Sequence, residues 1–299
     1  MRLFRVPVSN GFITRFITRF ITQRAIILTA VMASACAAEL DEGCPALQVG
    51  NIGHRGTGNT SSGNPFPENT IESFLQAATE GAQMVELDVT HSADGVLVVI
   101  HDARVDRTTD GSGCVAEMSL SDLQSLDAGF GTAMEGTGVV IPTLAQVLDA
   151  VDVDINIEVK IHDSCPTIDV PRVAQDIASA IASDTKERRI IVSSFDAEML
   201  VAVQNVDPSI YLGLLTILLD DAEVAAAAGF SSLNVISFIL SDVEEVRRIQ
   251  DMGLDVIVWT ENEPANMADF MTWGVDMIIT DEPDLLETAR SEWCERAGY

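Results

Sequence analysis

Residues 84–101 read MVELDVTHSADGVLVVIH, and this stretch decides the fold. Two β-rich runs flank Asp94-Gly95, a dipeptide typical of two-residue hairpin turns. With the turn centred between residues 94 and 95, residue 88 lies opposite residue 101, and cross-strand partners project to the same face. We therefore expect the hairpin to bring His101 beside Asp88.

Short β-rich runs and helical patterns alternate along the rest of the chain. Such alternation indicates an α/β protein with a mostly parallel sheet. The expected strands are 49–53, 84–89, 96–100, 153–159, 190–193, 210–214, 233–236, 255–259 and 276–280. Nine strands are one too many for an eight-stranded barrel, and a hairpin that rises above the rim removes the excess. The sequence thus predicts a (β/α)₈ TIM barrel with a hairpin and a small insertion, residues 103–141, above the carboxyl rim.

Length and composition narrow the class of protein. The 299 residues are 47% hydrophobic and 21% charged, which is enough for a sizeable core. Lys and Arg number 17 against 46 Asp and Glu, and the net charge of -29 opposes binding to nucleic acid or acidic membranes. No apolar run reaches about 18 residues, which excludes a multispan membrane protein. Without a convincing linker, one catalytic domain over residues 45–293 is expected.

The first 38 residues resemble a signal peptide. Five arginines precede the first acid, and the apolar run Ala25 to Met32 leads into Ala33-Ser34-Ala35-Cys36-Ala37-Ala38. Cleavage after Ala35 or after Ala38 fits this pattern, and the former would leave Cys36 for lipidation as in a weak lipobox. The alternative is an amphipathic helix built on the repeated Phe-Ile-Thr-Arg unit. We expect an exported protein, whose membrane contact would be limited to a lipid anchor at Cys36.

Four further cysteines remain, and export permits disulfides. Cys44 and Cys294 lie near the two ends of the mature chain, which are often close in a domain. The favoured pairs are therefore Cys44–Cys294 and Cys114–Cys165. Four free thiols and metal ligation are the alternatives, although no C-x-x-C pair occurs.

Polar residues recur where the expected strands end, which is where parallel α/β barrels place their reacting groups. His54 and Arg55 follow the first strand, and His101 ends the hairpin. Alternate residues of a strand share a face, so Glu86 with Asp88, and Asn156 with Glu158 and Lys160, can converge on one cavity.

The residue types in this cluster suit phosphate chemistry. Glu86, Asp88 and Glu158 offer oxygen ligands for one divalent cation, Mg²⁺ or Ca²⁺, rather than zinc. His54 and His101 could act as acid and base near neutral pH. Arg55 and Lys160 could pair with phosphate oxygens, and the only other lysine is Lys186.

Taken singly, each feature has a plainer interpretation. A Glu-x-Asp pair is commonly a solvated strand edge, and a single histidine is commonly structural. Glu86 and Asp88 lie in an apolar frame, where buried carboxylates need partners. It is the combination that favours a site, and His91 and His162 are expected at the surface or rim instead.

These pieces, in this order, resemble the glycerophosphodiester phosphodiesterases over about residues 50 to 290. The matching segments are Gly53-His54-Arg55-Gly56, Pro67-Glu68-Asn69-Thr70, Glu86-Leu87-Asp88-Val89, Asp94-Gly95, His101-Asp102, Arg107-Thr108-Thr109-Asp110-Gly111, Ile141-Pro142-Thr143-Leu144, Asn156-Ile157-Glu158-Val159-Lys160, Ser193-Ser194-Phe195, Val258-Trp259-Thr260-Glu261-Asn262 and Ile278-Ile279-Thr280-Asp281-Glu282-Pro283. Two departures are the long Gly/Ser/Asn-rich stretch 57–66 and Glu261, where an apolar residue is more usual.

The resemblance implies hydrolysis of glycerophosphodiesters to glycerol 3-phosphate and an alcohol. It implies that Glu86, Asp88 and Glu158 hold the cation and that His54 and His101 form the acid/base pair. Arg55 and Lys160 would bind phosphate, Glu68 would contribute to substrate binding, and Trp259 would form an apolar wall near the glycerol or the alcohol. The nucleophile is either water or the glycerol 2-hydroxyl.

Two other functions compete with this one. A lysophospholipase D or sphingomyelinase-like phospholipase would use the same site but would need an apolar entrance, whereas residues 103–141 are mainly small and polar. A non-catalytic exported protein that binds phosphodiesters would have a decayed site, yet both histidines and all three carboxylates are present. The sequence gives no indication of the oligomeric state.

Overall fold

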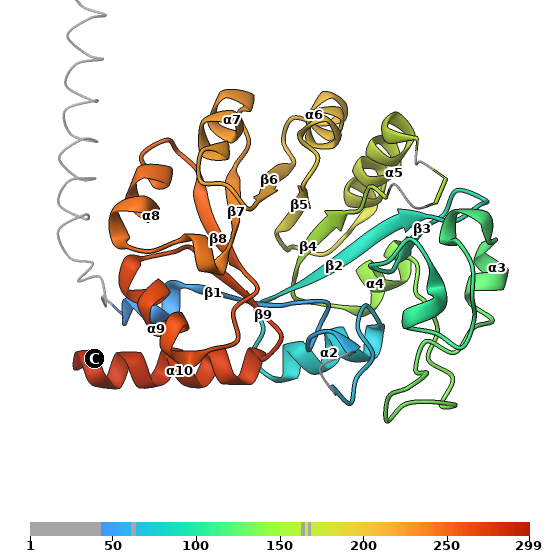
Figure 1. Cartoon of the computed structure of the whole chain (residues 1–299), viewed down its shortest axis with the longest axis horizontal. Helices are drawn as coiled ribbons and strands as arrows, with labels where there is room; N and C mark the ends of the chain where they lie inside the picture. Colours follow the sequence, from blue (N-terminus) through green and yellow to red (C-terminus); the bar gives the residue numbers. More distant parts are fainter. Residues whose placement is uncertain (1–42, 61–63, 163–164, 167–168) are drawn as a thin grey trace, which may run out of the picture. The chain divides into compact units, whose positions relative to one another are not determined.

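Eight parallel strands close into a barrel in the computed structural model, as the sequence predicts (Figure 1). The strands are β1 (Gly50–Gly53), β2 (Met84–His91), β4 (Asp154–Val159), β5 (Ile190–Ser194), β6 (Tyr211–Thr216), β7 (Ser232–Ile236), β8 (Asp255–Trp259) and β9 (Met277–Thr280). Each pairs with its neighbour in this order, and β1 pairs with both β9 and β2, which closes the ring. Parallel pairing places all eight carboxyl ends at one rim.

The structure describes residues 43–60, 64–162, 165–166 and 169–299, which include the unit Cys44–Tyr299. The expected signal segment, with Cys36, lies outside them. Within the described ranges, none of the helices combines the length and the apolarity that a membrane span requires.

Alternate side chains of each strand face either the surrounding helices or the interior of the barrel. On β2, Val85, Leu87 and Val89 belong to the core cluster that the surrounding helices share, while Glu86 and Asp88 alternate with them. A second apolar cluster, with Ile52, Met84, Ile191, Ile257, Met277 and Ile279, fills the barrel interior. The inward residues therefore change along β2 from Met84 to the two carboxylates, which places the polar groups near the carboxyl rim.

Helices follow the strands around the outside of the ring (Figure 1). They are α2 (Ile71–Thr79), α4 (Leu144–Ala150), α5 (Val170–Ser183), α6 (Ala197–Val206), α7 (Asp221–Ala228), α8 (Val243–Gln250), α9 (Pro264–Trp273) and α10 (Pro283–Ala297). Several begin at a side-chain cap: Thr70 accepts from Ser73 N at α2, and Asp242 accepts from Glu244 N at α8. The last helix is tied to the 3₁₀ turn η1 (Pro45–Gln48) by the predicted disulfide Cys44–Cys294.

The predicted hairpin is present, but its predicted register is wrong by one residue. Strand β3 (Leu97–Val99) runs antiparallel to β2 with Val89 opposite Val99, and Ile100 N donates to the carbonyl of Asp88. The loop has three residues, 93–95, because Ser92 N bonds to the carbonyl of Val96 and Gly95 takes a left-handed φ of 77°. His101 therefore follows the paired part of the hairpin.

Residues 103–141 form the small insertion that was predicted. It contains the 3₁₀ turns η3 (Val105–Arg107) and η4 (Val115–Glu117) and the short helix α3 (Leu120–Leu123). A separate apolar cluster that includes Val98, Ile100, Val115 and Leu123 packs it onto the hairpin. The second predicted disulfide, Cys114–Cys165, connects it to the segment after β4.

Candidate active site

Three carboxylates meet at the carboxyl ends of neighbouring strands β2 and β4. The parallel register places Asp88 beside Glu158 and Glu86 beside Asn156. All three carboxylates are buried, and one oxygen from each lies within 4.8 Å of the others. The structure thus brings together the residues that the sequence predicts as cation ligands.

The cluster fits a divalent cation. Glu86 Oε1 is buried and has no hydrogen-bond partner among the described residues, and Asp88 Oδ1 has none apart from its ion pair with Lys160. Burial raises the pKa of Glu86 well above its usual value, and the charges of Asp88 and Glu158 raise it further. Burial and the charge of Asp88 also raise the pKa of Glu158 to about 7. Oxygen atoms in such a group are suitable ligands for Mg²⁺ or Ca²⁺.

Two cationic side chains flank the carboxylates. Lys160 Nζ lies 2.5 Å from Glu158 Oε1 and 3.2 Å from Asp88 Oδ1. Arg55 Nε lies 3.5 Å from Asp88 Oδ2. Burial raises the pKa of Asp88, but Lys160 and Arg55 outweigh it, so that the pKa lies below its usual value. Asp88 thus stays ionised, and both cations are positioned at the cavity where a phosphate would bind.

His54 lies at the end of β1 and is oriented by a carboxylate from β9. Its Nδ1 is 2.6 Å from Asp281 Oδ1, and Asn262 Nδ2 donates to Asp281 Oδ2 at 2.9 Å. Burial raises the pKa of Asp281, but the hydrogen bond and charge of His54 together with the hydrogen bond from Asn262 outweigh it, so that the pKa is lowered. An ionised Asp281 requires the proton on Nδ1, which leaves Nε2 for proton transfer.

His101 has the same arrangement with different partners. Its Nδ1 is 2.6 Å from Asp102 Oδ1, and Arg107 Nε donates to Asp102 Oδ2 at 2.7 Å. The hydrogen bond from His101 is the largest cause that lowers the pKa of Asp102. Both predicted acid/base residues line the same cavity as Glu86 and Glu158, despite the shifted register of the hairpin.

Glu68 is enclosed by two arginines. Arg107 donates from Nη1 and Nη2 to its two oxygens at 2.7 and 2.8 Å, and Arg55 Nη1 donates at 2.9 Å. Burial raises the pKa of Glu68, but the hydrogen bonds of Arg107 and the charge of Arg55 outweigh it, so that its pKa is about 2. The position of Glu68 suits the orientation of Arg55 and Arg107, whereas the sequence analysis expects it to bind substrate.

Asn69 completes the carboxylate cluster from the loop before α2. Its Nδ2 donates to Asp88 Oδ2 at 2.8 Å, and Asp88 N donates to its Oδ1 at 3.1 Å. Asn69 and Arg55 are the two non-glycine residues with positive φ in the described chain, at 59° and 51°. Such conformations cost energy and are frequent at functional sites.

One wall of the cavity is apolar. Trp259, Phe195, Leu215 and Ile279 line it together with the polar residues above, around a volume of about 170 Å³. The rings of Trp259 and Phe195 meet edge to face at 5.4 Å, and Trp259 Nε1 donates to the carbonyl of Asn234 at 2.8 Å. Trp259 thus occupies the wall position that the sequence analysis expects.

The two remaining histidines differ from each other. His91 was expected at the surface or rim, and this is wrong: it is buried between β2 and α5, with Nε2 3.1 Å from Asp176 Oδ2. It does point away from Asp88, as strand parity predicts. His162 is half-buried near His101. Burial lowers the pKa of His162, and the charge of His101 lowers it further. The unusual Glu261 is buried in the loop before α9, where it accepts from Glu263 N at 2.8 Å and from Asn266 Nδ2 at 3.1 Å.

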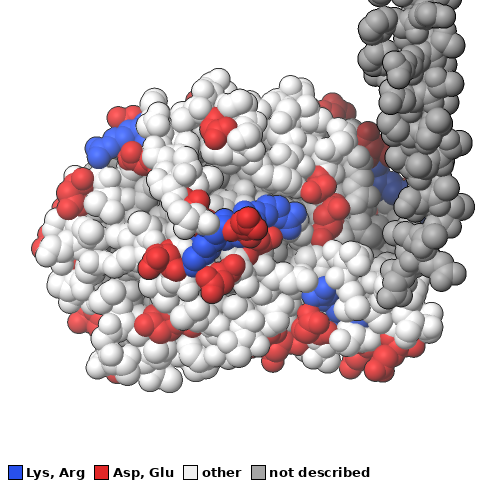
Figure 2. Space-filling view, turned by 180° about the vertical axis from the view of Figure 1, so that it is seen from behind, with Lys and Arg blue, Asp and Glu red and all other residues white. Residues whose placement is uncertain are grey.

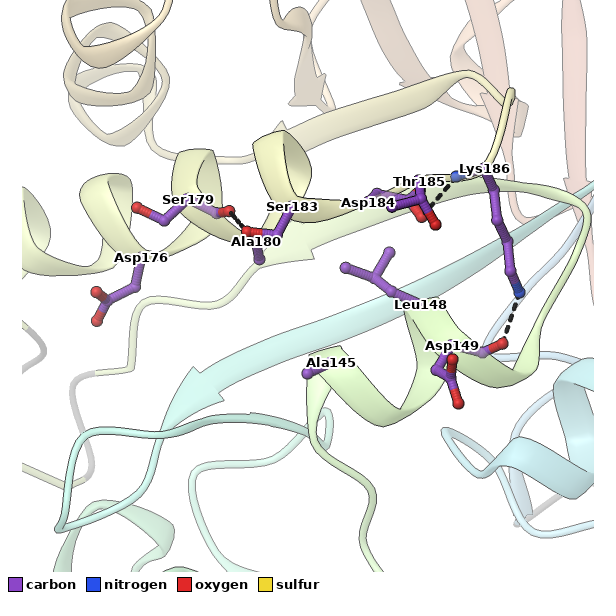
Figure 3. A pocket seen from close by; sticks show the side chains of 10 residues that line it. All are labelled: Ala145, Leu148, Asp149, Asp176, Ser179, Ala180, Ser183, Asp184, Thr185 and Lys186. Atoms are coloured by element: carbon purple, nitrogen blue, oxygen red, sulfur yellow. Dashed lines mark hydrogen bonds between the residues drawn. The ribbon is translucent and has the colours of Figure 1, made fainter.

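Surface charge and a further pocket are also seen away from this cavity. On the face drawn in Figure 2, acidic side chains are spread widely, while Lys and Arg gather mainly in one central band. A pocket of about 430 Å³ lies between α4 and α5, where Lys186 Nζ donates to the carbonyl of Asp149 at 2.6 Å (Figure 3). It shares no lining residue with the cavity that holds the carboxylates.

Sequence reasoning missed four residues of the site: Asn69, Asp102, Arg107 and Asp281. Each lies inside a motif quoted above, so their identity was visible. Their roles depend on contacts between distant segments, such as Arg107 with Glu68, 39 positions apart. Only the requirement that a catalytic histidine needs an orienting partner could have pointed to Asp102 and Asp281.

A parallel barrel whose rim joins buried carboxylates, two carboxylate-oriented histidines and two cations defines a hydrolase that acts on phosphate esters. The model of the glycerophosphoryl diester phosphodiesterase family matches residues 54–285. The chain belongs to this family of phosphoric diester hydrolases.

Relatives and solved structures agree with this assignment. A glycerophosphodiester phosphodiesterase of Caldanaerobacter subterraneus subsp. tengcongensis is 35% identical over 240 residues, which cover 79% of this chain and 95% of that protein. One from Bacillus subtilis is 32% identical and covers 80% and 85%. The structure of an Oleispira antarctica phosphodiesterase in complex with the product sn-glycerol-3-phosphate has a TM-score of 0.74 and 26% identity, covering 82% of this chain and 98% of that one.

Proposed function

We propose that the protein hydrolyses glycerophosphodiesters to glycerol 3-phosphate and an alcohol, with His54 and His101 as the acid/base pair and one divalent cation, Ca²⁺ or Mg²⁺, as cofactor. The observation that carries the proposal is the pairing of each histidine with its own carboxylate at one cavity. Nδ1 of each is 2.6 Å from an aspartate oxygen, which directs both Nε2 atoms away from these partners.

Glu86, Asp88 and Glu158 would hold the cation, and it would supply neutralisation of the phosphoryl oxygens. Arg55 and Lys160 would bind the phosphate and hold it against the cluster. One histidine accepts the proton of the nucleophile, and the other protonates the alkoxide as its bond to phosphorus breaks. The nucleophile is water or the glycerol 2-hydroxyl, and with the hydroxyl a cyclic phosphate is then opened by water.

The alternative functions receive less support. The named relatives are glycerophosphodiester phosphodiesterases, and neither a lysophospholipase D nor a sphingomyelinase-like activity is favoured by them. The complete set of histidines, carboxylates and cations argues against a protein that only binds phosphodiesters.

His54→Ala and Glu86→Ala test the proposal. Release of glycerol 3-phosphate from glycerophosphocholine should fall by about 10²–10⁴ in His54→Ala, the range typical for loss of acid/base catalysis. It should fall at least as far in Glu86→Ala, because that variant removes a ligand of the cation. Glu223→Ala on the exposed face of α7 is the control and should keep full activity. Activity that survives both site variants would refute the assignment.

We further propose that the protein is exported, either released by cleavage after Ala38 or anchored by a lipid on Cys36 as its only link to a membrane. The N-terminal pattern of 1–38 supports this, and the disulfides Cys44–Cys294 and Cys114–Cys165 suit an oxidising compartment. The mass of the protein isolated from its host tests it. A chain that begins at a lipidated Cys36 would mean export with an anchor, a chain that begins after Ala38 would mean export without one, and an uncleaved chain would contradict export.

A further inference from the structure

Large apolar side chains are exposed on three successive loops of the carboxyl rim. Phe195 follows β5, Ile217 and Leu218 follow β6, and Phe238 follows β7. Their exposed fractions are 51, 57, 59 and 77%. Apart from the C-terminal Tyr299, no other large apolar side chain in the described part of the chain is so exposed. We call these four residues the apolar ledge.

The ledge continues the apolar wall of the active-site cavity. Strands β5, β6, β7 and β8 are consecutive neighbours in the barrel, so the loops after them begin at adjacent positions of the carboxyl rim. Phe195 belongs to both regions, because it lines the cavity and contacts Trp259. Leu215 lines the cavity from within β6, and the loop that carries Ile217 and Leu218 begins after Thr216, the last residue of that strand. Phe195 thus links the apolar wall of the cavity to the exposed apolar residues of the neighbouring loops.

Packing of the barrel does not account for the ledge. The buried apolar residues of β6 and β7, such as Leu212, Leu214, Leu233 and Val235, already belong to the core shared with the helices. The four ledge residues lie beyond the strand ends, where exposed apolar side chains contribute little to stability. Large exposed apolar side chains on neighbouring loops beside a pocket are typical of ligand contact.

The cavity itself holds only part of a large diester. Its volume of about 170 Å³ lies below the range of about 300–1,000 Å³ that larger ligands occupy, and a pocket of about 570 Å³ adjoins it at Glu158, Lys160 and Phe195. The polar side of the cavity, with Arg55, His101 and Lys160, suits the phosphate and the hydroxyls of glycerol. A leaving alcohol that extends past Phe195, which lines both pockets, reaches the ledge.

We propose that the apolar ledge binds a hydrocarbon chain carried by the leaving alcohol of a glycerophosphodiester substrate. The proposal rests on the proposed function and specifies its substrate class. Net hydrolysis breaks the bond between phosphorus and the alcohol oxygen and forms one between phosphorus and the oxygen of water. The proton of water goes to the alkoxide, and the products are glycerol 3-phosphate and a chain-bearing alcohol.

A series of synthetic substrates tests the chain preference. Glycerophosphoethanol, -butanol, -hexanol and -octanol are assayed below their aggregation concentrations, with glycerol 3-phosphate as the measured product. A hydrocarbon chain on an open ledge keeps one side in water, so each methylene contributes about half the binding free energy of a fully buried one. We therefore expect kcat/KM to rise about twofold per methylene. A kcat/KM that does not change with chain length, while glycerophosphocholine is hydrolysed, would overturn the proposal and leave the proposed function intact.

The variant that tests the ledge changes two ledge residues that do not line the cavity. Phe238→Ser with Leu218→Ser should flatten the chain-length dependence and leave kcat/KM for glycerophosphocholine unchanged. Leu75→Ser is the matched control, because Leu75 is 46% exposed on α2, away from the ledge. It should preserve the chain-length dependence. If no substrate yields glycerol 3-phosphate in the folded protein, the proposed function itself fails.

Two other occupants of the ledge would give different results. If the ledge binds a hydrocarbon chain carried by the glycerol, 1-octanoyl-glycerophosphocholine would be preferred over glycerophosphocholine. The kcat/KM of the alcohol series would then not change with chain length. If a second copy of the chain covers the ledge, sedimentation velocity would show a dimer that Phe238→Ser dissociates. Either result would overturn the assignment to the leaving alcohol.

Discussion

His54 and Asp281 are 227 residues apart, yet Nδ1 of the histidine lies 2.6 Å from Oδ1 of the aspartate. The barrel produces this contact, because β1 and β9 pair in the ring with Gly53 opposite Thr280. Each residue directly follows its strand, so closure of the barrel places them together. The aspartate fixes the tautomer of the histidine, as an orienting carboxylate does in other hydrolases.

Asp281→Asn should lower kcat about 100-fold with little change in KM. An asparagine can donate its amide to Nδ1 and thereby favour the wrong tautomer, while binding of substrate by Arg55 and Lys160 is preserved. Steady-state kinetics with glycerophosphocholine measure both constants, with Glu282→Gln as a neighbouring control. A kcat within twofold of the unchanged protein would show that Asp281 does not position His54.

Glu68 should stabilise the protein in a pH-dependent way. Its pKa of about 2 lies below the value of about 4.3 for an unfolded chain, so its stabilisation is present above pH 4.3 and is lost as the pH falls toward 2. Glu68→Gln should reduce the free energy of unfolding by about 3 kcal/mol at pH 7. The difference from the unchanged protein should shrink below pH 4. Urea denaturation at pH 7, 5 and 3.5 checks this, with Glu72→Gln as control, and a difference that is independent of pH would contradict it.

The strand pattern allowed the barrel to be predicted, because apolar alternation and turn residues act locally. All nine expected strands are present, with ends shifted by at most two residues. The register of the hairpin was mispredicted because Asp94-Gly95 also fits a three-residue loop with Gly95 in the left-handed region. Local sequence does not distinguish these two turns, since packing of Val98 and Ile100 under the insertion also contributes.

Residues that themselves bind a cation or transfer a proton could be predicted from the sequence. Residues that only orient such groups could not. Glu86, Asp88, Glu158 and both histidines are recognisable as groups that bind cations or transfer protons. Asp281 and Arg107 act only through His54, Asp102 and Glu68, and these contacts appear once the chain is folded. Glu68 was recognised as part of the site, but its two arginine partners were not.

Glu86→Gln should stabilise the cation-free protein while it abolishes activity. Glutamine removes one of three buried carboxylates that lie within 4.8 Å of one another, and it can still accept from Arg55 N. The free energy of unfolding in chelator should rise by about 1–2 kcal/mol. Glu261→Gln provides a contrast, because the buried Glu261 accepts hydrogen bonds from Glu263 N and Asn266 Nδ2, and their weakening should destabilise. A destabilised Glu86→Gln protein would mean that the carboxylates do not repel one another in the absence of cation.

The Cys114–Cys165 disulfide should stabilise the insertion beside His101. It closes a loop with a sequence separation of 51, for which loop-closure entropy gives about 4 kcal/mol. The double change Cys114→Ser with Cys165→Ser should therefore reduce the free energy of unfolding by about 3–4 kcal/mol. Urea denaturation measures it, and reducing agent should destabilise this variant less than the unchanged protein. An unchanged free energy would show that the bridge adds nothing to the packing of Val115 and Leu123.

The central claim, a cation-dependent phosphodiesterase site at Glu86, Asp88 and Glu158, is tested most directly by one assay. Release of glycerol 3-phosphate from glycerophosphocholine is measured in chelator and again after Ca²⁺ or Mg²⁺ is restored. We predict that activity disappears in chelator and returns with one of the two cations, which also identifies the cofactor. Full activity in chelator would contradict the proposed role of the three carboxylates.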